Sequence, residues 1–123
     1  MGSNSNMIPA TQEDKDAFQQ GMLSNYSKGM IKDIEPYAYD PIPAVNAKGG
    51  RNVDGWRSVF VATVQKDWTN GLGNLHGAAA AWIVDVISSV AIAPLATDTW
   101  WGPPMLTGVS LAIDMLYFNA APV

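Results

Sequence analysis

The residues most capable of chemistry lie in the second half of the chain. Asn70 is followed by His76 and Gly77, and Asp85 comes eight residues later inside a long apolar run. A carboxylate among apolar side chains costs free energy unless it has a hydrogen-bonding partner or a task. It can serve as a general base or nucleophile, while a backbone amide at a helix start stabilises negative charge on an oxygen. The plainer interpretation, that Asp85 hydrogen-bonds a nearby serine or backbone amide, is equally compatible with the residues alone.

Other chemical motifs in the same region are incomplete. Gly71-x-Gly73-x-x-x-Gly77 follows an expected strand, but its third glycine is one place late for a dinucleotide-binding turn. His76 is the single histidine and the chain has no cysteine, so the residues predict no metal centre. No G-x-S-x-G elbow is present, which argues against a serine hydrolase. We expect neither a metal nor a cofactor.

Composition limits the classes of protein that remain. The chain has 123 residues, of which 48% are hydrophobic and 15% are charged, as in one small folded domain. A formal net charge of −4 argues against a sequence-independent nucleic-acid binder, which needs a basic surface. The absence of cysteine and of a signal-peptide pattern at the start favours a reducing compartment. We expect a cytoplasmic protein, with the mitochondrion as the alternative.

The pattern of side chains predicts a mixed α and β chain. A capping threonine with acids after it predicts a helix over residues 11–25. Residues 31–39 and 57–66 have the composition of strands, and 108–118 alternates between apolar and small or polar residues, as strands do. Glycine-rich segments predict a loop over 46–55 and a turn at 70–73.

The apolar run at residues 75–95 predicts a long helix. Only Asp85, Ser88 and Ser89 interrupt it, and their spacing places them on one stripe. The run is long enough to cross a membrane, but Asp85 would then lie near mid-bilayer at a cost of about 2.5–3.5 kcal/mol. All seven basic residues precede position 67, so none follows the helix to orient it in a bilayer. We therefore predict a buried core helix and no membrane span.

One stretch resembles a known family. TNGLGNLHGAAAAWIVD, residues 69–85, resembles the signature of the hotdog-fold acyl-CoA thioesterases of the phenylacetic-acid-pathway and acyl-CoA thioesterase-13 type. The later GVSLAIDMLYFNAAP resembles the strand after that family's central helix, with Ser110 at its hydroxyl position and Pro122 near its proline. The resemblance covers roughly residues 60–122. Six residues match the signature: Asn70, Gly73, Leu75, His76, Gly77 and Asp85.

The resemblance implies an α+β hotdog fold, a long central helix wrapped by an antiparallel sheet, in one domain over residues 1–123. It implies hydrolysis of acyl-CoA to free acid and CoA in a homodimer or homotetramer, with Asp85 and the turn contributed by opposite protomers. Gly77 would bind the thioester oxygen and Asp85 would act as general base or nucleophile. Asn70 would orient the water or thioester, His76 would shape the turn, and Ser110 would hold the water or the carboxylate.

The same resemblance implies a binding surface for coenzyme A. Its phosphates require cations, and the expected ones are Lys48, Arg51 and Lys66. Trp100 and Trp101 lie in a stiff proline-containing loop that can cap a ligand pocket.

Three departures from the family leave other functions open. Ala78 replaces the signature's second glycine, and residues 96–107 form a longer loop than is usual. The chain ends at Val123, where the family's fourth strand should begin, so we expect a hotdog domain that lacks its C-terminal strands. The alternatives are a hotdog protein that binds, or carries out another reaction on, an activated or polyketide-like substrate, and an inactive fragment that completes a partner chain.

Overall fold

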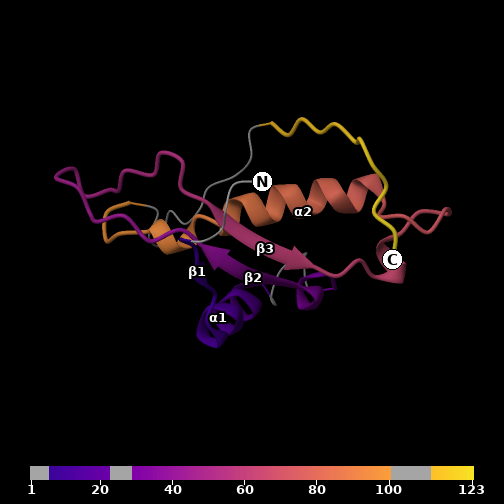
Figure 1. The fold of residues 1–123 in the computed structure, drawn as a ribbon, viewed down its shortest axis with the longest axis horizontal. Coiled ribbons are helices and arrows are strands. Elements are labelled where there is room, and N and C mark those ends of the chain that lie inside the picture. The colour runs from indigo at the N-terminus through magenta and orange to yellow at the C-terminus, as the bar shows by residue number, and fades with distance from the viewer. Residues whose placement is uncertain (1–5, 23–28, 101–111) are drawn as a thin grey trace.

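The chain forms an α+β unit with a three-stranded antiparallel sheet and one long helix (Figure 1). The computed structural model describes residues 6–22, 29–100 and 112–123. This layout is compatible with a hotdog-like arrangement. The elements of the described chain are β1 (Ile8–Pro9), α1 (Gln12–Met22), β2 (Ile34–Tyr39), β3 (Ser58–Ala62) and α2 (Gly77–Val90), with 3-10 turns at Ile31–Asp33, Lys66–Trp68 and Ala93–Leu95.

The sheet has the order β1-β2-β3, and both pairings are antiparallel. The β2–β3 ladder is irregular between Pro36 and Ala38, where Tyr37 is an extra residue on β2. Such a bulge changes which face the residues beyond it occupy. As a result Pro36 and Tyr39, three apart in sequence, lie opposite Phe60 and Ser58, which are two apart and share a face.

Helix α1 agrees with the expected N-terminal helix over its described part, and residues 23–28 lie outside the description. Its start is a capping box: the Asp14 amide donates to the Thr11 hydroxyl at 3.1 Å, and the Thr11 amide donates to the Asp14 carboxylate at 2.7 Å. Lys15 forms an ion pair with Glu35 of β2 at 2.9 Å. The Phe18 ring lies 5.4 Å from the Phe60 ring of β3, measured between centroids. These contacts attach α1 to the sheet.

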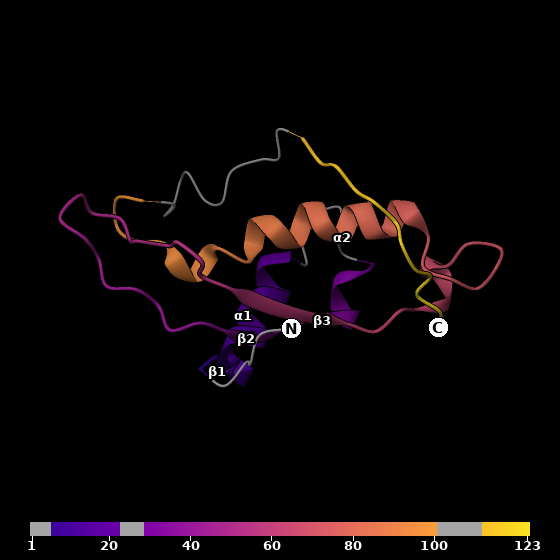
Figure 2. The same cartoon turned by 45° about the horizontal axis from the view of Figure 1, so that its top comes forward.

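Helix α2 runs beside β3 in both views of the fold (Figures 1 and 2). None of its residues is buried, and the exposed fraction of Val84 is 42%. The prediction of a buried core helix is therefore wrong for a single copy, because the three described strands are too few to enclose so apolar a helix. By length and composition alone, Gly77–Leu95 could cross a membrane, a test that core helices of soluble proteins and signal sequences also pass.

The buried core holds the two ends of α2. Trp68 lies in the 3-10 turn before the helix, and its carbonyl accepts a hydrogen bond from the His76 amide at 2.7 Å. Leu95 lies in the 3-10 turn after the helix and is only 1% exposed. The remaining buried apolar residues of the described chain, Ile34 and Ala38, belong to β2. Burial thus anchors α2 at its termini and leaves its middle half-exposed.

Four expected elements differ from those observed. The strand expected over 31–39 begins at Ile34, after the 3-10 turn at Ile31–Asp33. The strand expected over 57–66 is limited to Ser58–Ala62, and the helix expected over 75–95 ends at Val90. The strand expected over 108–118 is wrong for residues 112–118, which have no regular secondary structure; residues 108–111 lie outside the description. Alternation favours a strand only where a partner strand is available.

The C-terminal segment instead contacts the start of α2. The Tyr117 hydroxyl donates to the Gly77 carbonyl at 2.8 Å, and the Leu75 amide donates to the Ala121 carbonyl at 2.7 Å. Asn74 and Pro122 form an isolated antiparallel bridge. These contacts hold residues 117–122 against the helix start without forming a strand.

Candidate functional site

Asn70 organises the turn that leads into α2. Its side-chain oxygen accepts hydrogen bonds from the amides of Leu72 at 2.9 Å and Asn74 at 3.3 Å. Its backbone carbonyl accepts from the Gly73 amide at 3.0 Å, and Gly73 has a φ of 77°, a conformation that favours glycine. The Asn70 side chain therefore has a structural task within its own loop.

His76 and Gly77 form the start of α2. The Nδ1 atom of His76 accepts a hydrogen bond from the Ala78 amide at 3.0 Å, so the imidazole is the N-cap of the helix. The amide of Gly77 finds no acceptor among the described residues. A free amide at the positive end of a helix dipole is a donor suited to an oxygen that gains negative charge.

Asp85 lies on α2 eight residues after Gly77, which is about 12 Å along the helix axis. Its side chain is half-exposed. Its backbone carbonyl accepts from the hydroxyls of Ser88 at 3.1 Å and Ser89 at 3.2 Å, so the three residues share one stripe as expected. One copy of the chain therefore does not bring the carboxylate to the Gly77 amide.

The residues expected to bind coenzyme A do not gather at one place. The Arg51 guanidinium donates to the backbone carbonyls of Pro43, Leu95 and Ala96, close to the C-terminal end of α2. Lys48 is exposed in the same loop, whereas Lys66 precedes the N-terminal end of α2.

The expected tryptophan cap is described only in part. Trp100 pairs with Thr97, and a Cβ atom added at Gly50 would lie 3.2 Å from the Trp100 ring, so this ring packs closely on the 46–51 loop. Trp101 and Ser110 lie outside the described residues.

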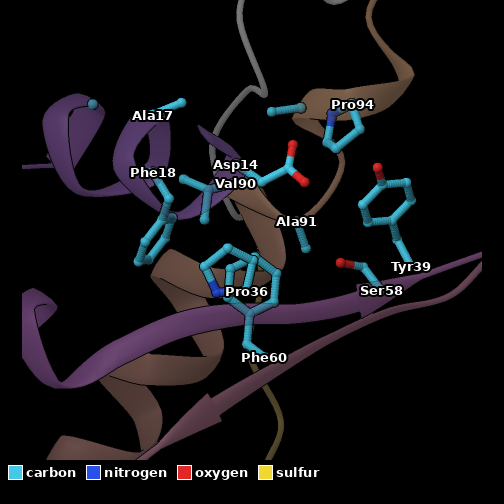
Figure 3. A pocket seen from close by; sticks show the side chains of 12 residues that line it. Asp14, Ala17, Phe18, Pro36, Tyr39, Ser58, Phe60, Val90, Ala91 and Pro94 are labelled. Carbon is cyan, nitrogen blue, oxygen red and sulfur yellow. The ribbon is translucent and has the colours of Figure 1, made fainter. Parts of the chain in front are cut away.

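A pocket of about 450 Å³ lies elsewhere, between α1, the sheet and the C-terminal end of α2 (Figure 3). None of the residues that the sequence analysis assigned to catalysis or substrate binding lines this pocket. Most of its wall is apolar, because it is lined by the paired rings of Phe18 and Phe60 and by Pro36 and Pro94. Sequence reasoning missed it because the bulge at Tyr37, which places Tyr39 beside Pro36 on one face, has no local signature. The lining residues are Asp14, Ala17, Phe18, Gly21, Pro36, Tyr39, Ser58, Phe60, Val90, Ala91, Ala93 and Pro94.

An ion pair between Asp40 and Arg57 lies outside both the α2 start and the pocket. The Arg57 guanidinium donates to both carboxylate oxygens of Asp40, at 2.9 and 3.0 Å, and the Arg57 amide donates to the same carboxylate at 2.8 Å. The side-chain hydrogen bond from Arg57 lowers the pKa of Asp40, and Asp40 in turn raises the pKa of Arg57. The pair fastens the end of β2 to the start of β3 and has no place in the proposed chemistry.

The described residues contain no group of three or more histidine, aspartate or glutamate side chains placed to hold a metal ion. Comparison with known proteins found no matching family model, no similar curated protein and no similar solved structure.

Proposed function

We propose that the chain hydrolyses acyl-CoA thioesters at a site assembled between two copies. The observation that carries the proposal is the start of α2. There the Asn70 turn and the His76 cap present a Gly77 amide that has no acceptor among the described residues, and Asp85 follows on the same helix. The spacing of these residues resembles the thioesterase signature.

In the proposed reaction the thioester carbonyl oxygen accepts a hydrogen bond from the Gly77 amide. A water molecule attacks the carbonyl carbon while Asp85 of the second copy takes its proton. The carbon–sulfur bond then breaks, and the proton on Asp85 passes to the departing thiolate. Acyl-CoA and water thus become a free acid and CoA.

A site shared by two copies is what the resemblance implies, and the distance along α2 fits it. The Gly77 amide and the Asp85 carboxylate must both reach one thioester group and its water, whereas the two residues of one copy are separated by about 12 Å of helix. Every residue of α2 is at least partly exposed, so the helix is available to face a second copy.

The test is release of free thiol from acyl-CoA by the full chain. Asp85→Asn should lower kcat by about 10²- to 10⁴-fold, the usual effect of losing a general base. Asp98→Asn removes the same charge from an exposed loop and should leave turnover unchanged. Turnover of Asp85→Asn close to that of the parent would overturn the assignment of Asp85.

A second pair of variants tests the Gly77 amide. Gly77→Pro removes the amide proton at a helix position that proline tolerates, and His76 before it already has the extended conformation that a following proline requires (φ −64°, ψ 137°). Gly77→Ala keeps the proton and is the matched control. We expect the proline variant to lose about 10²- to 10³-fold in kcat.

Mixing the two inactive variants tests the shared site. A dimer of one Asp85→Asn chain and one Gly77→Pro chain holds one intact site of two, and half of randomly formed dimers are of this kind. Activity should therefore return to about a quarter of the parent value. No recovery on mixing, with both variants shown to exchange subunits, would place both groups in one copy.

Binding without hydrolysis is the second candidate function. The pocket beside α1 favours it, because that pocket is lined by none of the residues assigned to hydrolysis.

A further inference from the structure

We propose that the pocket between α1, the sheet and the end of α2 binds a small primary amine that has an apolar body. The proposal does not depend on thioester hydrolysis, since the pocket lies at the opposite end of α2 from Gly77. Its volume of about 450 Å³ is within the range of small-molecule sites.

The bulge in β2 gives the floor of the pocket an apolar end and a polar end. Phe60 lies opposite Pro36, and Ser58 lies opposite Tyr39, so two cross-strand pairs sit next to one another on the same face. The first pair presents a ring and a proline, and the second presents two hydroxyl groups. A ligand lying along this floor must therefore have an apolar part and a polar part.

The apolar end is completed by the helices. The Phe18 ring of α1 tilts against the Phe60 ring, and Val90 from the last turn of α2 lines the same cavity (Figure 3). Burial of ligand carbon on this surface contributes roughly 25 cal/mol for each Å² removed from water. This part of the site selects for an aliphatic or aromatic body.

The polar end has acceptors that the described residues leave unpaired. The hydroxyls of Tyr39 and Ser58 make no hydrogen bond to any described residue, and both side chains line the cavity (Figure 3). The Asp14 carboxylate lines it as well. One Asp14 oxygen accepts from Thr11 in the capping box, and the other is available to a ligand.

Charge decides which polar group fits. The ion pairs of the described chain are Lys15 with Glu35 and Arg57 with Asp40, so no described lysine or arginine neutralises Asp14. A half-buried carboxylate beside apolar rings favours a cation and repels an anion. An ammonium group has three donors for the carboxylate and hydroxyl oxygens that line the cavity, whereas a carboxylate ligand has none.

The test compares three probes with the same six-carbon chain and different head groups: hexylamine, hexan-1-ol and hexanoate. Each is titrated into the full chain at neutral pH and fixed ionic strength, and binding is followed by the amide NMR shifts of pocket residues. We expect saturable binding of hexylamine about tenfold tighter than that of hexan-1-ol, with hexanoate weakest. The largest shifts should fall on Phe60, Val90 and Ala91.

Three variants of α1 test which residue gives the preference for the amine and where the probes bind. Asp14→Asn removes the charge but keeps an oxygen for the Thr11 amide, so the capping box persists while the affinity for hexylamine falls about tenfold, to that of hexan-1-ol. Asp16→Asn removes an equal charge from the exposed side of α1 and should leave the preference intact. Ala17→Trp adds bulk at an exposed pocket residue and should abolish binding of all three probes.

The proposal is overturned if none of the probes saturates, if all three bind equally, or if hexanoate binds best. It is also overturned if Asp14→Asn, with an unchanged unfolding transition, keeps the preference for hexylamine. Because none of these measurements uses acyl-CoA, they are independent of the outcome for hydrolysis.

Discussion

Asn70 has a structural role that its residue type alone did not reveal. Its carbonyl oxygen is engaged by two backbone amides of its own turn, so a residue expected to orient water instead directs that oxygen into the loop. The site at positions 70, 76, 77 and 85 stays a prediction from residue types, and the sequence did not reveal the hydrogen-bond partners of these residues.

Asn70→Ala should lower the free energy of unfolding by about 1 kcal/mol, because two amides of the turn lose their acceptor. Urea denaturation followed by far-UV circular dichroism measures the change. Asn70→Asp keeps an acceptor oxygen at the same place and should restore most of the loss. Equal stability of the parent and the alanine variant would contradict the structural role.

The Asp40–Arg57 pair predicts how stability depends on pH. Arg57 lowers the pKa of Asp40 in the folded chain, so the folded chain stabilises the ionised carboxylate more than the unfolded chain does. The stabilisation is complete above the unfolded pKa of about 3.9 and is lost as the pH falls through the lower, folded pKa. Arg57 stays charged throughout, because its pKa is raised.

Urea denaturation at pH 7 and at successively lower pH values, on the parent and on Asp40→Asn, measures this contribution. The parent should lose more stability on acidification than the variant does. Identical pH profiles would show that the pair does not stabilise the fold.

At the scale of elements, the sequence predicted whether a segment forms a helix or a strand better than it predicted where that element begins and ends. The capping signal, the β-branched residues and the apolar run correctly indicated α1, β2, β3 and α2. The end of α2 was placed too late, since Pro94 and the 3-10 turn at Ala93–Leu95 interrupt a run whose hydrophobicity continues. The strand expected over 108–118 failed because alternation carries no information about whether a neighbouring strand exists.

Arg51 illustrates a contact that a sequence does not reveal. Its guanidinium binds the carbonyls of Pro43, eight residues away, and of Leu95 and Ala96, more than forty residues away. It joins the 43–51 loop to the C-terminal end of α2. Composition identified it only as a cation, and it was therefore expected to bind phosphate.

Arg51→Met should lower the free energy of unfolding by about 2 kcal/mol, because three part-buried carbonyls lose a charged donor. Lys48→Met removes a nearby exposed charge and should change stability by less than about 0.5 kcal/mol. Thermal and urea unfolding measure both. If Arg51→Met is as stable as Lys48→Met, the guanidinium is free for a phosphate after all.

At the scale of the molecule, the apolar surface of α2 exceeds what the described sheet covers. Val84 is exposed on the helix, and Ile113, Leu116 and Phe118 are exposed in the C-terminal segment. Among the described strands, β3 is an edge strand with one side unpaired. Exposed apolar surface and an open strand edge both favour association.

We therefore expect the chain to be a dimer or higher oligomer at micromolar concentration, as measured by light scattering coupled to gel filtration. Val84→Lys places a charge on the exposed side of α2 and should shift the chain toward monomer. Ile42→Lys adds the same charge at a similarly exposed loop position and should not. A monodisperse monomeric parent that melts cooperatively would contradict the expectation and, with it, the shared thioesterase site.

The bulge at Tyr37 also determines where the chain tolerates a change of length. Tyr37 has no partner residue on β3, so its deletion leaves every remaining β2–β3 pair, and both β1–β2 pairs, in their present alignment. Deletion of a neighbouring residue also removes the bulge, but it brings Tyr37 into the ladder, opposite Val59 in place of the buried Ala38 or opposite Phe60 in place of Pro36. A library of single-residue deletions in β2 should therefore recover the most stable chains at position 37, with the deletions of Pro36 and Ala38 less stable.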